Sequence, residues 1–355
     1  MEKMTRPPVS IGAECVKNLW RRSGKRHLFI TGSKQRGKST LFSAMFGQNV
    51  GLFSRFDRDA GLVELKNAQT GRASVIGRIE NGKMTPVPGG FDHGAATLNS
   101  WAEGTFFIDE IGFLESSDPK YCAALKSLWD RVPVAAVLRK QPSPLFERED
   151  ALVVDLDQWY SRFENLKLCC VVMASGRSER FSGNKLLAEF NGAPLVSSLF
   201  SAIPRELFDT VVAVTRYEAV AELAKSAGLS ALVHDEPALA DTIRLGVEFC
   251  PGADGYMLCV GDQPFLSRDT FVALAADFAL QPECILRPVC GDTPGNPVIF
   301  PGRFRDELRS LSGETGGRAV IRAHPEALVL HPIADPREFF DVDTRENYAR
   351  LTEAR

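Results

Sequence analysis

Several classes of protein are excluded by what this sequence lacks. No apolar run in its 355 residues approaches the roughly 20 residues that a membrane-spanning helix needs. The first residues, MEKMTRPPVSIGAE, contain no apolar signal core ahead of a small-residue cleavage site, which predicts a cytoplasmic protein. The sequence also lacks repeats and low-complexity tracts. A content of 44% hydrophobic and 25% charged residues is typical of a folded chain and not of a disordered one.

Metal-binding cysteine patterns are missing as well. The eight cysteines form no C-x-x-C pair, and none of the five histidines lies at zinc-finger spacing from a cysteine pair. Several cysteines stand in apolar runs, such as Cys169 and Cys170 in LCCVVMAS, and we interpret them as buried reduced thiols. The four tryptophans are not interleaved with basic residues, so the sequence predicts no nucleic-acid surface.

The net charge of −3 conceals an asymmetry along the chain. Residues 1–160 contain 22 Lys and Arg against 18 Asp and Glu, which is +4, whereas residues 161–355 contain 20 against 27, which is −7. Residues 1–40 alone hold 10 basic and 2 acidic side chains. This basic excess suits a phosphate ligand, and it equally suits a solvated basic helix.

Short apolar segments alternate with helical patterns along the whole chain, which predicts an α/β protein with mostly parallel sheets. The length predicts two domains. We expect an N-terminal extension over 1–25, a first domain over 26–157 and a second domain over 166–355, with the boundary in the segment DQWYSRFENL. Each domain opens with a strand that leads into a Gly-containing loop, and such loops carry ligands at the carboxyl ends of strands.

A complete G-x-x-x-x-G-K-[ST] motif begins at the end of the first predicted strand, RHLFITG (26–32). Its glycines allow backbone amides to surround phosphate oxygens, Lys38 reaches the terminal phosphates, and Ser39 provides a ligand for Mg²⁺. The motif predicts that ATP or GTP binds here. The predicted nucleotide-binding residues are Gly32, Ser33, Gly37, Lys38, Ser39 and Thr40.

An acidic pair ends a later apolar strand, FFIDE, as a partner for this loop. Asp109 is predicted to hold Mg²⁺ through water, and Glu110 to orient an attacking water as a catalytic residue. Glu115 is as well explained by a solvated surface position as by a place in the site.

The motifs ITGxxxxGKST, IDEIGxxE and VLRK resemble the small nucleoside-triphosphatase family that hydrolyses several NTPs, over about residues 26–156. The resemblance implies a P-loop NTPase fold and places Arg139 at the late basic position of that family. Lys34, Gln35 and Arg36 depart from the small residues expected in the loop, which leaves open whether this domain hydrolyses NTP or only binds it. The GTP-binding adaptors of molybdenum-dinucleotide synthesis share the loop motif but not the IDEIG strand.

The second Gly-containing loop has a different character, because no G-K-[ST] ends it. Small residues at 174–176 are followed by Arg180 and Lys185, two cations that can neutralise a departing pyrophosphate. Asp262 follows the apolar strand YMLCV, where a carboxylate can hold Mg²⁺ against an α-phosphate, and Asp343 in the alternating DVDT segment is the predicted second metal ligand. The pattern predicts nucleotidyl transfer, with Arg180, Lys185 and Asp262 as catalytic residues.

Six motifs in order resemble the molybdenum cofactor cytidylyltransferase family over about residues 166–352: ASGxSxRFxxxKLL, GxPL, GDQPFL, PGNPVIF, GETGGR and DVDT. The resemblance implies a GT-A-like Rossmann-type fold that uses Mg²⁺ to transfer CMP from CTP to the molybdopterin cofactor phosphate, with release of pyrophosphate. It also implies that Asn296 faces the molybdopterin. The nucleotide-binding residues carried over are Ala174, Ser175, Gly176, Arg180 and Lys185.

Three alternatives stay open. Ser175 stands where Ala is usual in the cytidylyl branch and Gly in the guanylyl branch, so guanylyl transfer, or transfer to another phosphorylated metabolite, competes with the CTP reading. The chain could also be an NTP-gated chaperone that delivers cofactor to a client molybdoenzyme. A pure binding module would not require the set Arg180, Lys185 and Asp262.

Overall fold

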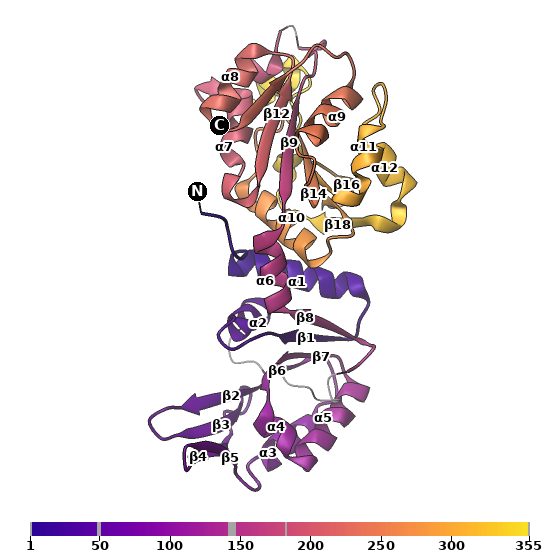
Figure 1. The fold of residues 1–355 in the computed structure, drawn as a ribbon. Coiled ribbons are helices and arrows are strands. Elements are labelled where there is room, and N and C mark those ends of the chain that lie inside the picture. Colours follow the sequence, from indigo (N-terminus) through magenta and orange to yellow (C-terminus); the bar gives the residue numbers. More distant parts are fainter. Residues whose placement is uncertain (1, 48–50, 141–146, 182, 354–355) are drawn as a thin grey trace. The chain divides into compact units, whose positions relative to one another are not determined.

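The chain divides into two compact units, shown in Figure 1. The N-terminal unit is Pro8–Ser161, and the C-terminal unit is Met1–Pro7 together with Arg162–Arg355. Both units are α/β. The computed structural model describes residues 2–47, 51–140, 147–181 and 183–353.

An eight-stranded sheet in the order β5-β4-β3-β2-β6-β7-β1-β8 forms the centre of the N-terminal unit. Strands β2, β6, β7, β1 and β8 pair in parallel, whereas β2 to β5 form an antiparallel meander, so the sheet is mixed where the sequence predicted mostly parallel sheets. The strands of the meander are only partly buried and are joined by short turns, which antiparallel pairing allows and parallel pairing does not. The strands are β1 (His27–Thr31), β2 (Leu52–Asp57), β3 (Leu62–Asn67), β4 (Ala73–Glu80), β5 (Lys83–Pro86), β6 (Phe106–Ile111), β7 (Val134–Leu138) and β8 (Ala151–Asp155).

Residues 9–23, expected in a separate N-terminal extension, form helix α1, which contacts α2 and β8 of the same unit. The sequence predicts a helix near 95–102, and in the structure this helix begins earlier, at Asp92. The proline and charge content of 140–150 predicts a loop, of which residues 141–146 lie outside the described part. The helices are α1 (Val9–Ser23), α2 (Lys38–Phe46), α3 (Asp92–Ser100), α4 (Phe113–Ser117) and α5 (Pro119–Arg131).

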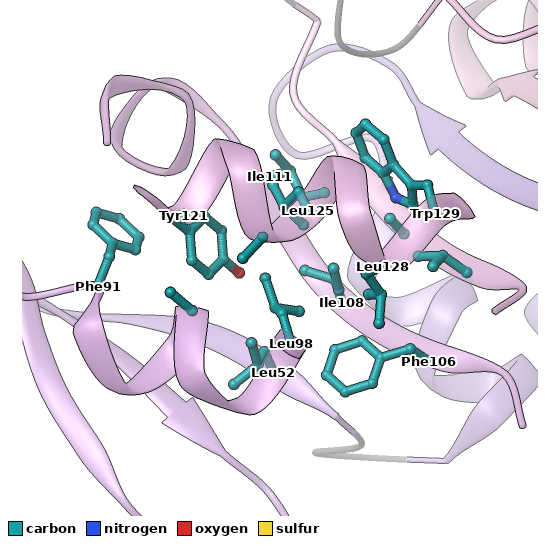
Figure 2. Close-up of a cluster of buried hydrophobic side chains, with 14 of the residues drawn as sticks. Leu52, Phe91, Leu98, Phe106, Ile108, Ile111, Tyr121, Leu125, Leu128 and Trp129 are labelled. Carbon is teal, nitrogen blue, oxygen red and sulfur yellow. The ribbon is translucent and has the colours of Figure 1, made fainter. Parts of the chain in front are cut away.

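The core of the N-terminal unit lies between α3, α5 and the sheet, as Figure 2 shows. Helix α5 presents Tyr121, Leu125, Leu128 and Trp129 at spacings of four, three and one residues, which places them on one helical face. All four side chains are buried, so the helix covers this side of the sheet. Burying each of these large side chains stabilises the unit by about 1.5–3 kcal/mol relative to exposure.

A second mixed sheet, in the order β13-β12-β9-β14-β17-β15-β16 with β18 beside β15, forms the centre of the C-terminal unit. Strands β13, β12, β9 and β14 are parallel, and β17 pairs antiparallel with both β14 and β15. The central strand β9 is apolar and almost entirely buried, as expected for a parallel strand covered on both faces. The strands are β9 (Leu168–Ala174), β12 (Thr210–Thr215), β13 (Ser230–Val233), β14 (Gly255–Val260), β15 (Ile285–Cys290), β16 (Thr293–Pro294), β17 (Val298–Pro301) and β18 (Leu328–Pro332), with the separate pair β10 (Glu189–Phe190) and β11 (Ala193–Pro194).

Helices connect most of these strands, as the alternating pattern predicted. Cys169 in β9 and Cys250 after α9 are joined by a disulfide, where the sequence suggested reduced thiols.

Among the described helices, none is both long and apolar enough to cross a bilayer. The helices are α7 (Leu195–Ala202), α8 (Glu218–Ser226), α9 (Leu239–Phe249), α10 (Arg268–Leu280), α11 (Arg305–Arg309), α12 (Arg318–Ala323) and α13 (Arg345–Glu353).

The segment predicted to contain the domain boundary is helix α6 (Leu156–Asn165). Leu156, Trp159, Tyr160 and Phe163 recur at helical spacing and are buried, which explains why the segment is helical. The division between the units falls inside this helix, after Ser161.

Candidate functional site

A cavity of about 730 Å³ opens in the C-terminal unit where β9 and β14 end. In a parallel sheet the carboxyl ends of neighbouring strands share one edge, so the loops that follow them meet there. The predicted residues that line this cavity are Ala174, Ser175, Gly176, Arg180, Lys185, Asp262 and Asp343. Segments more than 160 residues apart in the sequence therefore contribute to one cavity.

Lys185 lies at the centre of the charged part of this cavity. Its Nζ donates to Asp262 Oδ2 and, at 3.1 Å, to Asp343 Oδ1. Burial alone disfavours the ammonium, but the two carboxylates prevail and raise the pKa of Lys185. The lysine is held as a cation between two acidic residues from different loops.

Arg180 reaches the same group from the exposed rim, with Nη2 3.2 Å from Asp343 Oδ2. Burial opposes ionisation of Asp343, but Lys185 and Arg180 together hold the pKa of that carboxyl below its usual value. Two cations and two carboxylates alternate along one wall of the cavity.

The carboxylates of Asp262 and Asp343 are hard oxygen donors, and both lie within hydrogen-bond reach of one ammonium, so their chemistry suits Mg²⁺. Asp341 adds a third acidic group. Its pKa is raised to about 6, by loss of solvent first and by the charge of Asp262 next. Over the described residues, however, no group of three or more His, Cys, Asp or Glu side chains has the geometry of a ready-made metal site.

Asn296 is the predicted site residue that the structure does not bring to this group. It lies half-buried between β16 and β17 and does not line the cavity described above.

Two residues outside the prediction, His234 and Arg216, also contact or line this cavity. Ser175 Oγ donates to the carbonyl of Val214 and lies 2.7 Å from His234 Nε2. Burial first, and the charge of Arg216 second, lower the pKa of His234. Arg216 lines the cavity itself. The sequence offered only a weak signal for these side chains, namely their positions after β12 and β13.

A second cavity, of about 720 Å³, surrounds the loop between β1 and α2 in the N-terminal unit. Gly32 and Gly37 have φ values of 144° and 86°, in the left-handed region that favours glycine. Lys38 Nζ donates to the carbonyls of Gly32 and Ser33, both at 2.8 Å, so the lysine closes the loop into a ring. The predicted residues that line this cavity are Gly32, Ser33, Gly37, Lys38, Ser39, Thr40 and Glu110.

Asp109 comes from β6 and accepts a hydrogen bond from Ser39. Burial raises the pKa of Asp109, while the bond from Ser39 lowers it. Its Oδ1 is buried without a hydrogen-bond partner. A buried carboxylate oxygen left without a donor beside a serine hydroxyl suits a hydrated Mg²⁺.

Glu110 lies one residue further, in an irregular stretch of the β6–β7 pairing. Its φ is 115°, which is strained for a residue other than glycine, and its carboxylate forms an ion pair with Arg139. Glu115 is buried, where it accepts bonds from Ser54 Oγ and the Gly112 amide, both at 2.8 Å. Glu115 therefore braces the turn after β6 and is not a solvated surface residue.

Asp157 is the residue of this second cavity region that sequence reasoning missed. It accepts bonds from the Ser33 amide at 2.7 Å, from Arg36 Nε at 2.8 Å and from Lys140 Nζ at 3.0 Å. Burial opposes its ionisation, but these donors hold the pKa of Asp157 well below its usual value. The available signal was its position, because Asp157, like Asp109 and Asp262, lies at or just beyond the end of an apolar strand.

Comparison with known protein families gives a match within the C-terminal unit. Residues 170–328 match the MobA-like NTP transferase domain. The purine catabolism protein PucB of Bacillus subtilis is 28% identical over 201 residues, which cover 52% of this chain and 95% of PucB. A probable molybdenum cofactor guanylyltransferase of Thermococcus kodakarensis is 28% identical over 193 residues, which cover 52% of this chain and 94% of that protein.

Among solved structures, Rv0371c from Mycobacterium tuberculosis H37Rv is 23% identical, with a TM-score of 0.46, over 53% of this chain and 98% of Rv0371c. The family match begins at residue 170 and so lies within the C-terminal unit. Residues 170–328 are therefore similar to a MobA-like NTP transferase domain.

Proposed function

We propose that the C-terminal unit transfers CMP from CTP to the phosphate of the molybdopterin cofactor and releases pyrophosphate. The observation that carries the proposal is the cavity in which Arg180, Lys185, Asp262 and Asp343 converge beside the loop of small residues after β9. The match to a MobA-like NTP transferase domain supports nucleotidyl transfer as the reaction.

In this proposal an oxygen of the acceptor phosphate attacks the α-phosphorus of CTP, and the bond from that phosphorus to the β-phosphate oxygen breaks. Arg180 and Lys185 offset the negative charge that grows on the departing pyrophosphate. Asp262 and Asp343 would hold Mg²⁺, which supplies Lewis-acid polarisation of the α-phosphate when bound. No protein nucleophile is needed, because positioning and charge neutralisation provide the catalysis.

Guanylyl transfer to the same cofactor is the first alternative, and the Thermococcus kodakarensis relative named as a guanylyltransferase favours it. Transfer to another phosphorylated metabolite is the second. The discriminating experiment measures pyrophosphate release from CTP and from GTP, each with and without molybdopterin cofactor. Release that depends on CTP and the cofactor supports the proposal, whereas release from GTP alone, or release unaffected by the cofactor, contradicts it.

For the N-terminal unit we propose a separate P-loop site that binds ATP or GTP with Mg²⁺. The glycine-rich ring closed by Lys38 and the partnerless buried oxygen of Asp109 favour it. Glu110 would orient water if the bound NTP is hydrolysed. Binding of ATP or GTP that is lost in Lys38→Ala supports the site, and binding unaffected by Lys38→Ala contradicts it.

In the chaperone alternative the protein delivers cofactor to a client molybdoenzyme. That alternative predicts delivery without pyrophosphate release, so the pyrophosphate assay described above would detect no product.

A further inference from the structure

Three consecutive side chains at the end of β12, residues 215–217, each donate a hydrogen bond to one of three consecutive carbonyls at the end of β9, residues 174–176. Thr215 Oγ1 donates to the Ala174 carbonyl at 2.9 Å, and Arg216 Nε donates to the Ser175 carbonyl at 2.8 Å. Tyr217 Oη donates to the Gly176 carbonyl at 3.1 Å. The order of the donors follows the order of the acceptors, residue by residue.

This arrangement begins where the regular sheet ends. The parallel pairing of β12 with β9 stops at the pair Thr215 and Ala174. Beyond this pair the backbone ladder no longer supplies partners, and an unpaired buried carbonyl costs free energy. The side chains of residues 215–217 bind the carbonyl of the last paired residue, Ala174, and continue to the two carbonyls beyond it, those of Ser175 and Gly176. Tyr217 also donates its amide to Thr215 Oγ1 at 3.2 Å, which ties the donors to one another.

The orientation of these carbonyls determines where the amides of the loop point. In a trans peptide the C=O of one residue and the N–H of the next point in opposite directions. Because the carbonyls of residues 174–176 face the side chains of residues 215–217, the amides of residues 175–177 face away from those side chains. The same stretch lines the cavity proposed to take the nucleotide.

Arg216 additionally connects two walls of the cavity. Its Nη2 donates to the Glu236 carbonyl at 3.0 Å, just before Pro237 and Ala238, which line the cavity. Both nitrogens that Arg216 uses are therefore engaged with backbone carbonyls. The guanidinium fork suits two fixed acceptors at once, which a lysine ammonium on a flexible stem matches less well.

We propose that Thr215, Arg216 and Tyr217 form a carbonyl clamp, a set of positioning residues that pre-orients the backbone amides of residues 175–177 to receive the phosphates of a nucleoside triphosphate. This inference rests on the proposed nucleotidyl transfer. It extends that proposal to residues that neither the motifs nor the charged group of the cavity include. The clamp acts through the loop and does not itself take part in the chemistry.

The test measures CTP and GTP binding with Mg²⁺ by calorimetry, in the full chain carrying Lys38→Ala so that the other loop contributes nothing. The clamp variants are Tyr217→Phe, Arg216→Gln and Arg216→Lys. Each matched control removes a side chain that also donates to a backbone carbonyl but lies elsewhere in the unit. Tyr256→Phe removes a bond to the Cys250 carbonyl, and Arg303→Gln removes one to the Glu283 carbonyl.

We expect Tyr217→Phe to weaken binding about three- to tenfold, in keeping with the loss of one hydrogen bond, and Arg216→Gln to weaken it more. Arg216→Lys should lie between Arg216→Gln and the wild type, because it keeps the charge but loses the fork. The two controls should leave nucleotide affinity within about twofold, even if they lower the melting temperature.

Each outcome has a definite meaning. Wild-type binding with unchanged affinity in Tyr217→Phe and Arg216→Gln overturns the clamp and leaves the proposed function intact. Full affinity in Arg216→Lys shows that only charge matters, which also overturns it. Equal losses of nucleotide affinity in the clamp variants and the controls would show that these residues act only through the general stability of the unit, which also overturns the clamp. If the chain with intact residues 215–217 binds neither nucleotide, the proposed function fails, and the clamp fails with it.

Discussion

At the scale of single residues, Lys185 determines the electrostatics of the C-terminal cavity. It is largely buried and shared by Asp262 and Asp343, so each of the three charges depends on the others. Removing one partner of such a group leaves a charge with reduced compensation, which costs more than the loss of a surface ion pair. Substitutions here are therefore expected to affect both catalysis and local order.

The first prediction concerns Asp262. Asp262→Asn keeps the shape of the side chain but removes the carboxylate proposed to hold Mg²⁺, so pyrophosphate release should fall by about 100-fold or more. The melting temperature should change by only a few degrees. Asp335→Asn, at an exposed carboxylate of the same unit paired with Arg337, serves as the control and should keep full activity. Substantial release by Asp262→Asn would remove this residue from the mechanism.

The second prediction concerns His234. Burial first and Arg216 second lower its pKa, so Arg216→Gln should move the His234 titration upward when it is followed by NMR. His27 of the N-terminal unit, whose pKa is also lowered by burial, is the internal reference and should not move. A lowered histidine pKa costs stability as pH falls through the ordinary value of 6.5, so Arg216→Gln should also flatten that acid slope. An unchanged His234 titration would contradict the electrostatic contact.

At the scale of the element, the end of β6 shows how a local irregularity serves a site. The pairing of β6 with β7 shifts register after Ile108, and Glu110 adopts a positive φ within the shift. The irregularity brings Asp109 against Ser39 and Glu110 against Arg139. Backbone strain of this kind persists where the surrounding structure holds it, as Glu115 does here through the Gly112 amide.

The third prediction follows from that strain. Glu110→Gly relieves the positive φ at the cost of more freedom in the unfolded chain, so the N-terminal unit should keep its unfolding free energy or gain about 1 kcal/mol. Glu110→Ala loses the ion pair with Arg139 without relieving the strain and should be less stable than Glu110→Gly. Urea unfolding of the two variants measures the difference. Equal stability would show that the backbone at residue 110 is not strained.

The fourth prediction concerns the start of α6. Asp157 contacts the loop through Ser33 and Arg36. Because folding lowers the pKa of Asp157, its carboxylate stabilises the folded state at pH values above the ordinary aspartate pKa of 3.8, and this contribution is lost as the pH falls below 3.8. Asp157→Asn should therefore destabilise the N-terminal unit at pH 7, and the difference from wild type should shrink below about pH 4. Exposed Asp59→Asn is the control. A difference that does not change with pH would contradict the assignment.

At the scale of the whole molecule, each unit has its own sheet and its own apolar core. The chain passes between the units at two places, in the irregular segment at Pro7–Pro8 and inside α6 after Ser161. Each of these two cores draws its buried residues from a single unit, which is the property expected of units that can fold separately.

The fifth prediction is that the units act separately. CTP-dependent pyrophosphate release by the full chain should survive Lys38→Ala within about twofold, because Lys38 lies in the other unit. Loss of release in Lys38→Ala, with an unchanged melting curve, would show instead that occupancy of the N-terminal loop controls the transferase. Steady-state and stopped-flow assays of pyrophosphate release, run on the same preparations of wild type and Lys38→Ala, distinguish retained from lost transferase activity.

The sequence by itself determined the α/β class, the strand that leads into each loop, and a part of the residues that line each cavity. Such features are local, because a glycine-rich loop after an apolar strand and a carboxylate at a strand end follow from neighbouring residues and general sheet geometry. The sequence also indicated which carboxylates, Asp262 and Asp343, accompany the cations of the second loop. The match of residues 170–328 to a MobA-like NTP transferase domain agrees with that interpretation of the second half.

Only the tertiary structure decided the rest. The mixed sheets, the Cys169–Cys250 disulfide and the burial of Glu115 depend on which strands and helices become neighbours, and strand pairing is a long-range choice. Long-range packing also brings Asp157 into contact with the loop after β1, and the side chains of residues 215–217 into contact with the loop after β9. Their residue types are ordinary, and they gain a function only because the fold brings their polar atoms to backbone groups that the regular sheet no longer pairs.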